Sequence, residues 1–101
     1  MPNLHDQDDF ISMILPKKLD HEASQALRAE ILDHQGQNLA LSAAHVEFLG
    51  GAGAELILAT RAAWDAQDCD MTVVSPSAAF QKAALQLGLD QMPPFKQRGD
   101  K

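Results

Sequence analysis

The chain has 101 residues, of which 46% are hydrophobic and 22% are charged, a size and composition typical of one globular domain. Eight lysines and arginines stand against 14 aspartates and glutamates, which gives a formal net charge of −6. This acidic balance argues against nucleic acid or an anionic membrane surface as the main partner, because both would repel the chain. A single cysteine excludes an intrachain disulfide and a cysteine-rich metal site.

The sequence predicts neither a targeting signal nor a membrane-spanning segment. The first nine residues are polar and acidic and lack the basic and apolar regions of a signal peptide. The longest apolar stretch, residues 56–66, is interrupted by polar residues and is shorter than the ~20 residues that cross a bilayer. We therefore expect a cytoplasmic protein that does not insert into a membrane.

The first predicted unit is a strand followed by a helix. Residues 10–15 (FISMIL) are almost continuously apolar and end before a proline, which is typical of a short, largely buried strand. Residues 16–18 predict a turn, and Asp20 lies where a helix N-cap belongs. The helix expected over residues 23–34 has a core-facing apolar stripe, and it ends before Gly36, where we expect a positive φ.

The second unit follows the same order. Residues 39–42 (LALS) predict a strand, and residues 46–49 (VEFL) an extended approach to the next helix. That helix is expected over residues 52–67, after a glycine-rich turn at 50–53. Trp64, near its end, is equally consistent with a place in the core and with an exposed interface anchor.

The third unit completes the alternation. Residues 71–74 (MTVV) predict a strand, and residues 75–76 (SP) favour a helix with proline at its first position. The following residues have apolar side chains at the i, i+3, i+4, i+7 spacing of an amphipathic helix. They are Phe80, Ala83, Ala84 and Leu87, and Gly88 closes the helix.

Three strand-to-helix units in series predict an α/β fold with helices packed against one sheet. We place the domain at residues 10–90. The segments 1–9 and 93–101 are expected to be flexible polar termini, because they offer little apolar surface to bury.

The glycine-rich turn Gly50-Gly51-Ala52-Gly53 is the most distinctive local feature. Such a turn before a helix exposes backbone N–H groups that can hold an anion, and small residues let a partner's backbone approach closely. A dinucleotide fingerprint is only partial, because Leu56 stands where its third glycine belongs. A tight strand-to-helix connection, a partner surface and an anion site all remain open for this turn.

No catalytic or metal-binding set is recognisable in the sequence. The four histidines lack ligand spacing, and no hydroxyl side chain has an evident general base beside it. Cys69 lies in a polar turn, and the sequence gives it no base partner. We therefore expect no enzymatic activity, no metal and no cofactor.

Three blocks of the sequence resemble the STAS domain family, the fold of bacterial anti-sigma factor antagonists. Residues 15–28 (LPKKLDHEASQALR) resemble the first strand end and helix of that family. Residues 39–53 resemble its "Leu-Asp-Leu-Ser … Val-x-Phe-Leu-Asp-Ser-Ser-Gly" stretch, and residues 71–89 resemble its last strand and "Ser-Pro … Gly-Leu" helix. The resemblance implies a single α/β domain with a central mixed β-sheet of about four strands and helices packed against it.

The chain departs from the family at the phosphorylation motif. In the antagonists an Asp-Ser or Asp-Thr pair opens the second helix, and its hydroxyl group is phosphorylated by an anti-sigma kinase. Here Gly50 stands at the aspartate position and Gly51 at the acceptor position. No side chain from Gly50 to Gly53 can accept a phosphate, so the charge switch of the family is not expected at this site.

The resemblance implies a non-catalytic regulatory module that binds a protein partner, such as an anti-sigma factor, a kinase or another signalling protein, including one of bacterial chemotaxis. The alternatives are a cytoplasmic STAS accessory subunit of an ABC lipid transporter and a nucleotide- or anion-binding regulator. A homodimer is also compatible with the family. The expected partner-binding residues are Lys18, Asp20, Gly50, Gly51, Ala52 and Gly53.

Overall fold

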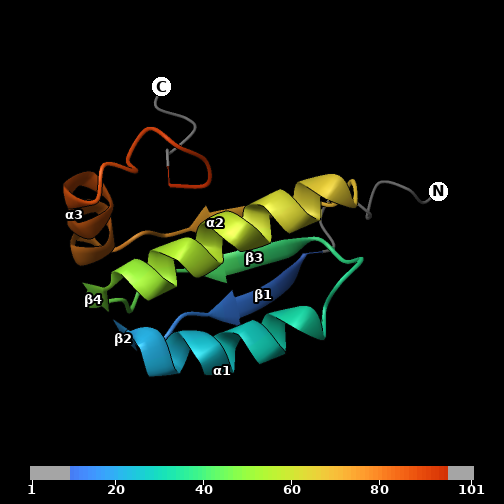
Figure 1. Cartoon of the computed structure of the whole chain (residues 1–101), viewed down its shortest axis with the longest axis horizontal. Helices are drawn as coiled ribbons and strands as arrows, with labels where there is room; N and C mark the ends of the chain where they lie inside the picture. The colour runs from blue at the N-terminus through green and yellow to red at the C-terminus, as the bar shows by residue number, and fades with distance from the viewer. Residues whose placement is uncertain (1–9, 96–101) are drawn as a thin grey trace.

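A computed structural model describes residues 10–95 of the chain. It contains five strands and three helices in the predicted α/β alternation (Figure 1). In chain order they are β1 (Ile11–Ile14), β2 (Lys18–Leu19), α1 (His21–Leu32), β3 (Leu39–Ser42), β4 (Phe48–Leu49), α2 (Gly51–Ala66), β5 (Met71–Val74) and α3 (Ala78–Gln86).

The strands form two sheets, one of three strands in the order β1-β3-β5 and one of two strands, β2-β4. All three strand pairings in the described residues are parallel. The α/β fold is therefore confirmed, whereas the expectation of a mixed sheet is wrong for this part of the chain. The reason is that a helix separates each strand from its partner and returns the chain to the same end of the sheet.

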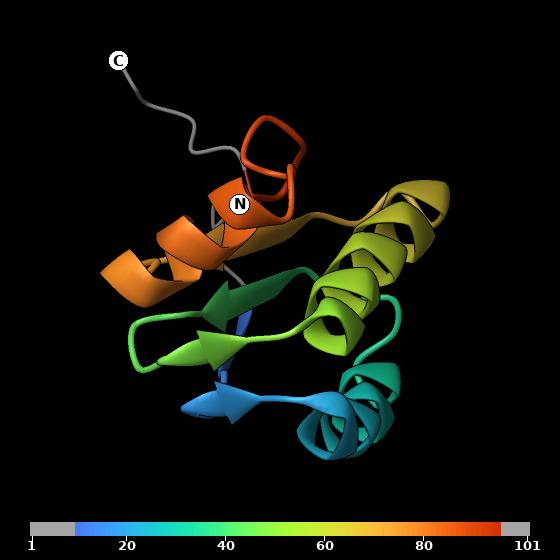
Figure 2. The ribbon, with the colours of Figure 1, turned by 60° about the vertical axis from the view of Figure 1, so that its left-hand side comes forward.

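The three-stranded sheet is covered by helices on one face. Helices α1 and α2 lie on this face, and α3 packs beside β4 (Figures 1 and 2). Along its shortest axis the molecule measures 23 Å, which fits one helix layer on one sheet. Leu39 and Leu41 of β3 are buried toward the helices, while the alternate residues of the strand, Ala40 and Ser42, are only partly buried.

Strand β1 is less buried than its sequence predicts. Its side chains alternate between half-buried and exposed, and Ile14 is 68% exposed. The expectation of a largely buried strand is wrong because β1 lies at the edge of the sheet. Its two exposed residues, Ser12 and Ile14, remain in contact with solvent on the side away from the helices.

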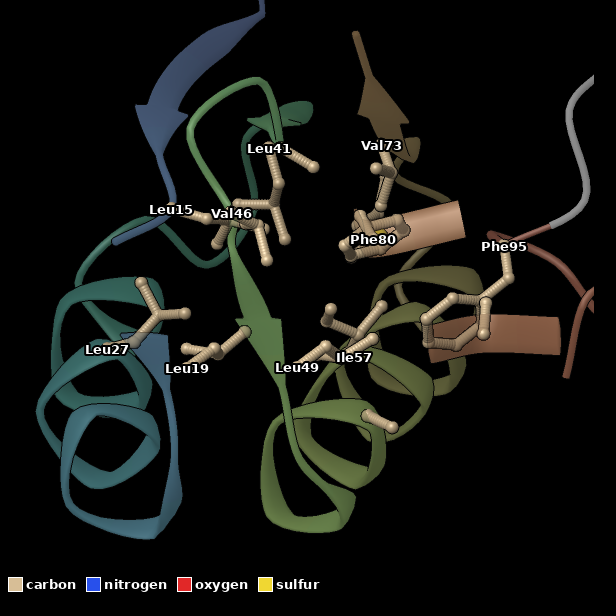
Figure 3. Packing of buried hydrophobic residues seen from close by; sticks show 14 of the residues in the cluster. Leu15, Leu19, Leu27, Leu41, Val46, Leu49, Ile57, Val73, Phe80 and Phe95 are labelled. Atoms are coloured by element: carbon tan, nitrogen blue, oxygen red, sulfur yellow. The ribbon is translucent and has the colours of Figure 1, made fainter. Parts of the chain in front are cut away.

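The hydrophobic core lies between the sheets and the three helices, where buried side chains from all of these elements meet (Figure 3). Trp64 is 1% exposed, and its indole Nε1–H donates a hydrogen bond to the carbonyl oxygen of Gln37 at 2.7 Å. Of the two interpretations of Trp64, the core position is therefore the correct one.

The helix ends follow local signals with one exception. Asp20 caps α1 as predicted, and Gly36 and Gly88 have positive φ angles of 87° and 77°. The third helix does not begin at Pro76, because Ser77 is its N-cap and accepts a hydrogen bond from the amide of Phe80. Leu87, expected in the core, follows the end of α3 and is 43% exposed.

The segment after α3 packs more closely on the domain than predicted. Pro94 and Phe95 are buried, and the ring of Phe95 stacks on that of Phe80 with a centroid distance of 5.6 Å (Figure 3). The prediction that residues 93–101 have nothing to bury is thus wrong for these two residues. Residues 96–101 and the expected N-terminal tail, residues 1–9, lie outside the described part of the chain.

Candidate protein-binding site

Two short strands bring the starts of α1 and α2 side by side. Strand β2 leads through Asp20 into α1, and β4 leads through Gly50 into α2. The parallel pairing places Lys18 beside Phe48 and Leu19 beside Leu49. The two helix N-termini therefore open at one end of the molecule, as Figure 2 shows.

The side chains of these two strands point alternately toward solvent and into the core. Leu19 is fully buried and Leu49 is 5% exposed, whereas Lys18 and Phe48 point outward. A backbone hydrogen bond from the amide of Gly50 to the carbonyl oxygen of Leu19, 3.2 Å long, continues the pairing into the second helix. The buried leucines thus hold the outward residues in fixed positions.

The start of α1 is capped by a side chain. The Oδ1 atom of Asp20 accepts a hydrogen bond from the amide of Ala23 at 2.9 Å, which satisfies one of the unpaired N–H groups of the first turn. Its Oδ2 atom lies 4.0 Å from Nζ of Lys18, whose side chain is 74% exposed. Asp20 is therefore engaged within the fold, and Lys18 is the freer of the two predicted binding residues.

The start of α2 has no such cap. Gly50 occupies the N-cap position and makes no side-chain hydrogen bond to the helix. Gly51 is exposed, and a Cβ atom built there would meet no other atom within 4 Å. Together with the half-buried Ala52, these residues form a smooth surface with no side chain larger than a methyl group.

Gly53 lies beneath this surface. It is buried, and a Cβ atom at this position would stand 2.7 Å from Cγ of Leu19 and 3.0 Å from its carbonyl oxygen. These distances are shorter than normal contacts, so only glycine allows the first turn of α2 to pack on β2. Gly53 is explained by this packing and does not need a partner.

Phe48 is a surface residue that sequence reasoning missed. Its side chain is 50% exposed, and its ring covers Gly50 so closely that a Cβ atom there would lie 3.1 Å from Cε2. Strict alternation in residues 46–49 would put Phe48 on the same side as Val46, which is buried. Val46 precedes the strand in a loop, so that alternation does not hold and the exposure of Phe48 was not evident.

The described residues hold no group of three or more His, Cys, Asp or Glu side chains that could bind a metal ion. Within the same part of the chain, no helix is both long enough and apolar enough to cross a membrane. The site is thus a solvent-facing surface made by Lys18, Phe48, Gly50, Gly51 and Ala52, which we call the glycine face.

Comparison with known proteins gives one match. Residues 11–94 match the family model described as "Mlab, STAS domain". No curated protein and no solved structure matches the chain. The family match covers most of the sequence and includes every strand and helix of the structure. The chain therefore belongs to the STAS domain family, as its three sequence blocks predicted.

Proposed function

We propose that this protein is a non-catalytic regulatory module that binds a protein partner through the glycine face. The observation that carries the proposal is the open position of Gly51, which is exposed at the start of α2 with free space around it. A partner's main chain can approach such a surface closely, because no side chain stands in the way.

Two side chains at the edge of the glycine face, those of Phe48 and Lys18, would contact a bound partner directly. Phe48 offers an exposed aromatic ring whose position is limited by its contact with Gly50, so little side-chain entropy is lost when a partner covers it. Lys18 lies beside it in the strand pairing and offers a positive charge. Buried aromatic anchors with a polar rim are typical of binding hot spots.

Binding through this face would not be controlled by phosphorylation at Gly51. A phosphate group would add about −1.5 to −2 charges at the start of α2, but no residue from Gly50 to Gly53 has a hydroxyl group. The partner would be an anti-sigma factor, a kinase or another signalling protein. In the alternative function, the same face would bind the ATPase of an ABC lipid transporter.

The test is a quantitative pull-down from native lysate with the wild type and the G51D variant. The carboxylate imitates part of the charge of a phosphate, and the free space at Gly51 lets it fold without a clash. We expect the specific partner to be lost from G51D and retained by the control variant A29D, which places the same charge on an exposed position of α1. Equal recovery by G51D would contradict the proposal, and the identity of the captured protein separates a signalling partner from a transporter ATPase.

A further inference from the structure

Within residues 10–95, one edge of strand β1 is unpaired. The strand pairs with β3 on one side, and no strand of the described residues pairs with its other side. The amides of Ile11 and Leu15 donate toward β3, to Asn38 at 2.8 Å and to Ser42 at 2.9 Å. Backbone groups alternate in direction along a strand, so those of Ile11, Met13 and Leu15 point toward β3. The N–H and C=O groups of the alternate residues, Ser12 and Ile14, therefore point to the unpaired side.

A groove lies along this edge. It has a volume of about 370 Å³ and runs between β1 and the C-terminal end of α1. Its lining residues are Ser12, Met13, Ile14, Glu30, Asp33 and His34. The groove therefore combines unpaired strand backbone with side chains from the end of a helix.

Two of the three ionisable side chains that line the groove are acidic. Glu30 and Asp33 are both exposed, and the third, His34, is half-buried. The ion pairs of the described residues lie elsewhere, between Lys18 and Asp20 and within α2. A ligand that brings positive charge would thus meet two carboxylates that form no ion pair within residues 10–95.

We propose that this groove binds an extended, basic segment of a partner protein, which adds to β1 as a further strand. Main-chain hydrogen bonds to Ser12 and Ile14 would supply affinity, as in other cases of strand addition. The chain's own first nine residues include three aspartates, so charge disfavours them as the occupant.

The geometry also sets the side-chain pattern of the added strand. Residues that point to the helix side would lie beside Met13 and face the carboxylates of Glu30 and Asp33, which favours lysine or arginine. Residues that point to the opposite side would lie beside the exposed Ile14, which favours valine or isoleucine. The bound segment should therefore alternate basic and β-branched residues.

This surface is separate from the glycine face, and the inference does not depend on the proposed function. The groove is built from the edge of β1 and the end of α1, whereas the glycine face is built at the starts of α1 and α2. A partner could occupy either surface alone.

The test titrates the full ¹⁵N-labelled chain with a capped eight-residue peptide that alternates lysine and valine, followed by NMR. We expect saturable binding with the largest amide shifts at Ser12, Ile14 and the end of α1. A matched peptide with N-methyl groups at alternate amides should bind at least roughly tenfold more weakly, because it cannot pair as a strand. A peptide that alternates glutamate and valine should not bind.

A double variant, E30Q with D33N, should weaken binding of the lysine peptide by roughly tenfold and reduce its dependence on salt. The control pair E55Q with D90N changes exposed or half-exposed carboxylates outside the groove and should leave binding unchanged. The proposal is overturned if the lysine peptide does not bind at millimolar concentration, if the N-methylated peptide binds equally well, or if the shifts lie away from β1.

Discussion

The first two strand-to-helix units of this protein, β2–α1 and β4–α2, have the same backbone construction but different chemistry at the start of the helix. In both, a two-residue strand with one buried leucine leads through a single extended cap residue into a helix. The first unit caps its helix with the carboxylate of Asp20, and the second begins its helix at Gly50 with no side-chain bond.

The two units differ in how the first turn of the helix is stabilised and in how open it is to solvent. A side-chain cap is worth about 0.5–2 kcal/mol relative to alanine, and the first unit has it. The second unit lacks it and is lined by glycine and alanine at a position that is open to solvent. Relative to glycine, however, a side-chain cap is worth only a few tenths of a kcal/mol, so the second unit gives up little stability for its open surface.

The largest expected effect distinguishes Gly53 from Gly51 in the second unit. G53A places a methyl group against Leu19 at distances that force the helix away from β2, and we expect a loss of about 2 kcal/mol of unfolding free energy. G51A adds the same methyl group in open space and should not destabilise the domain. Urea denaturation of both variants measures the contrast, and equal stabilities would show that the packing of α2 on β2 is described wrongly.

The next effect concerns the cap of the first unit. D20A removes the hydrogen bond to the amide of Ala23, so the unfolding free energy should fall by about 1 kcal/mol. The control D20N keeps an oxygen acceptor and removes the charge, and it should retain most of the stability. Thermal or urea unfolding measures the change in stability. A D20A variant as stable as the wild type would refute the assigned cap.

A smaller effect tests whether the ring of Phe48 disfavours a capping side chain at position 50, the N-cap of α2. G50S supplies the missing cap, worth a few tenths of a kcal/mol over glycine, but its Cβ atom would press on the ring of Phe48. The gain should therefore be larger in an F48A background than in the wild type. A double-mutant cycle of unfolding free energies measures this coupling, and additive effects would mean that the ring does not restrict Gly50.

The smallest effect concerns the ion pair of the first unit. Nζ of Lys18 lies 4.0 Å from Oδ2 of Asp20, and the Lys18 side chain is exposed, so K18A should change stability by less than about 0.5 kcal/mol. The same variant should weaken recovery of the partner in the pull-down, since Lys18 lies on the glycine face. A loss of stability without a loss of binding would assign Lys18 to the fold alone.

The sequence predicted those features that depend on local signals. The cap at Asp20, the positive φ of Gly36 and the strands β3 and β5 each follow from residues close in the chain. Strand β2 was not predicted, and its first residue, Lys18, was assigned to a turn over residues 16–18. The strand has only two residues and exists through its pairing with Phe48 and Leu49. Pairing between distant residues has no signature in a window of that length.

The sequence placed the glycine-rich turn and Lys18 in one candidate site but did not predict how each residue packs. Gly50, Gly51 and Ala52 do lie beside the β2–β4 pairing that holds Lys18, and Gly53 is buried. That Gly53 is a packing residue depends on its contact with Leu19, and the exposure of Phe48 depends on where β4 begins. Both features depend on tertiary structure, as does the burial of Phe95 against Phe80.

The most direct test of the central claim is photo-crosslinking at the glycine face in the native cell. A photoreactive amino acid in place of Glu55, an exposed residue one turn after Gly51 on α2, would flank the face without covering it. We predict a discrete adduct with one protein, strongly reduced when F48A or G51D is added and unchanged when A29D is added. An adduct whose yield is unchanged by both F48A and G51D would contradict the proposal that this face binds a protein partner. The absence of any adduct would contradict it as well.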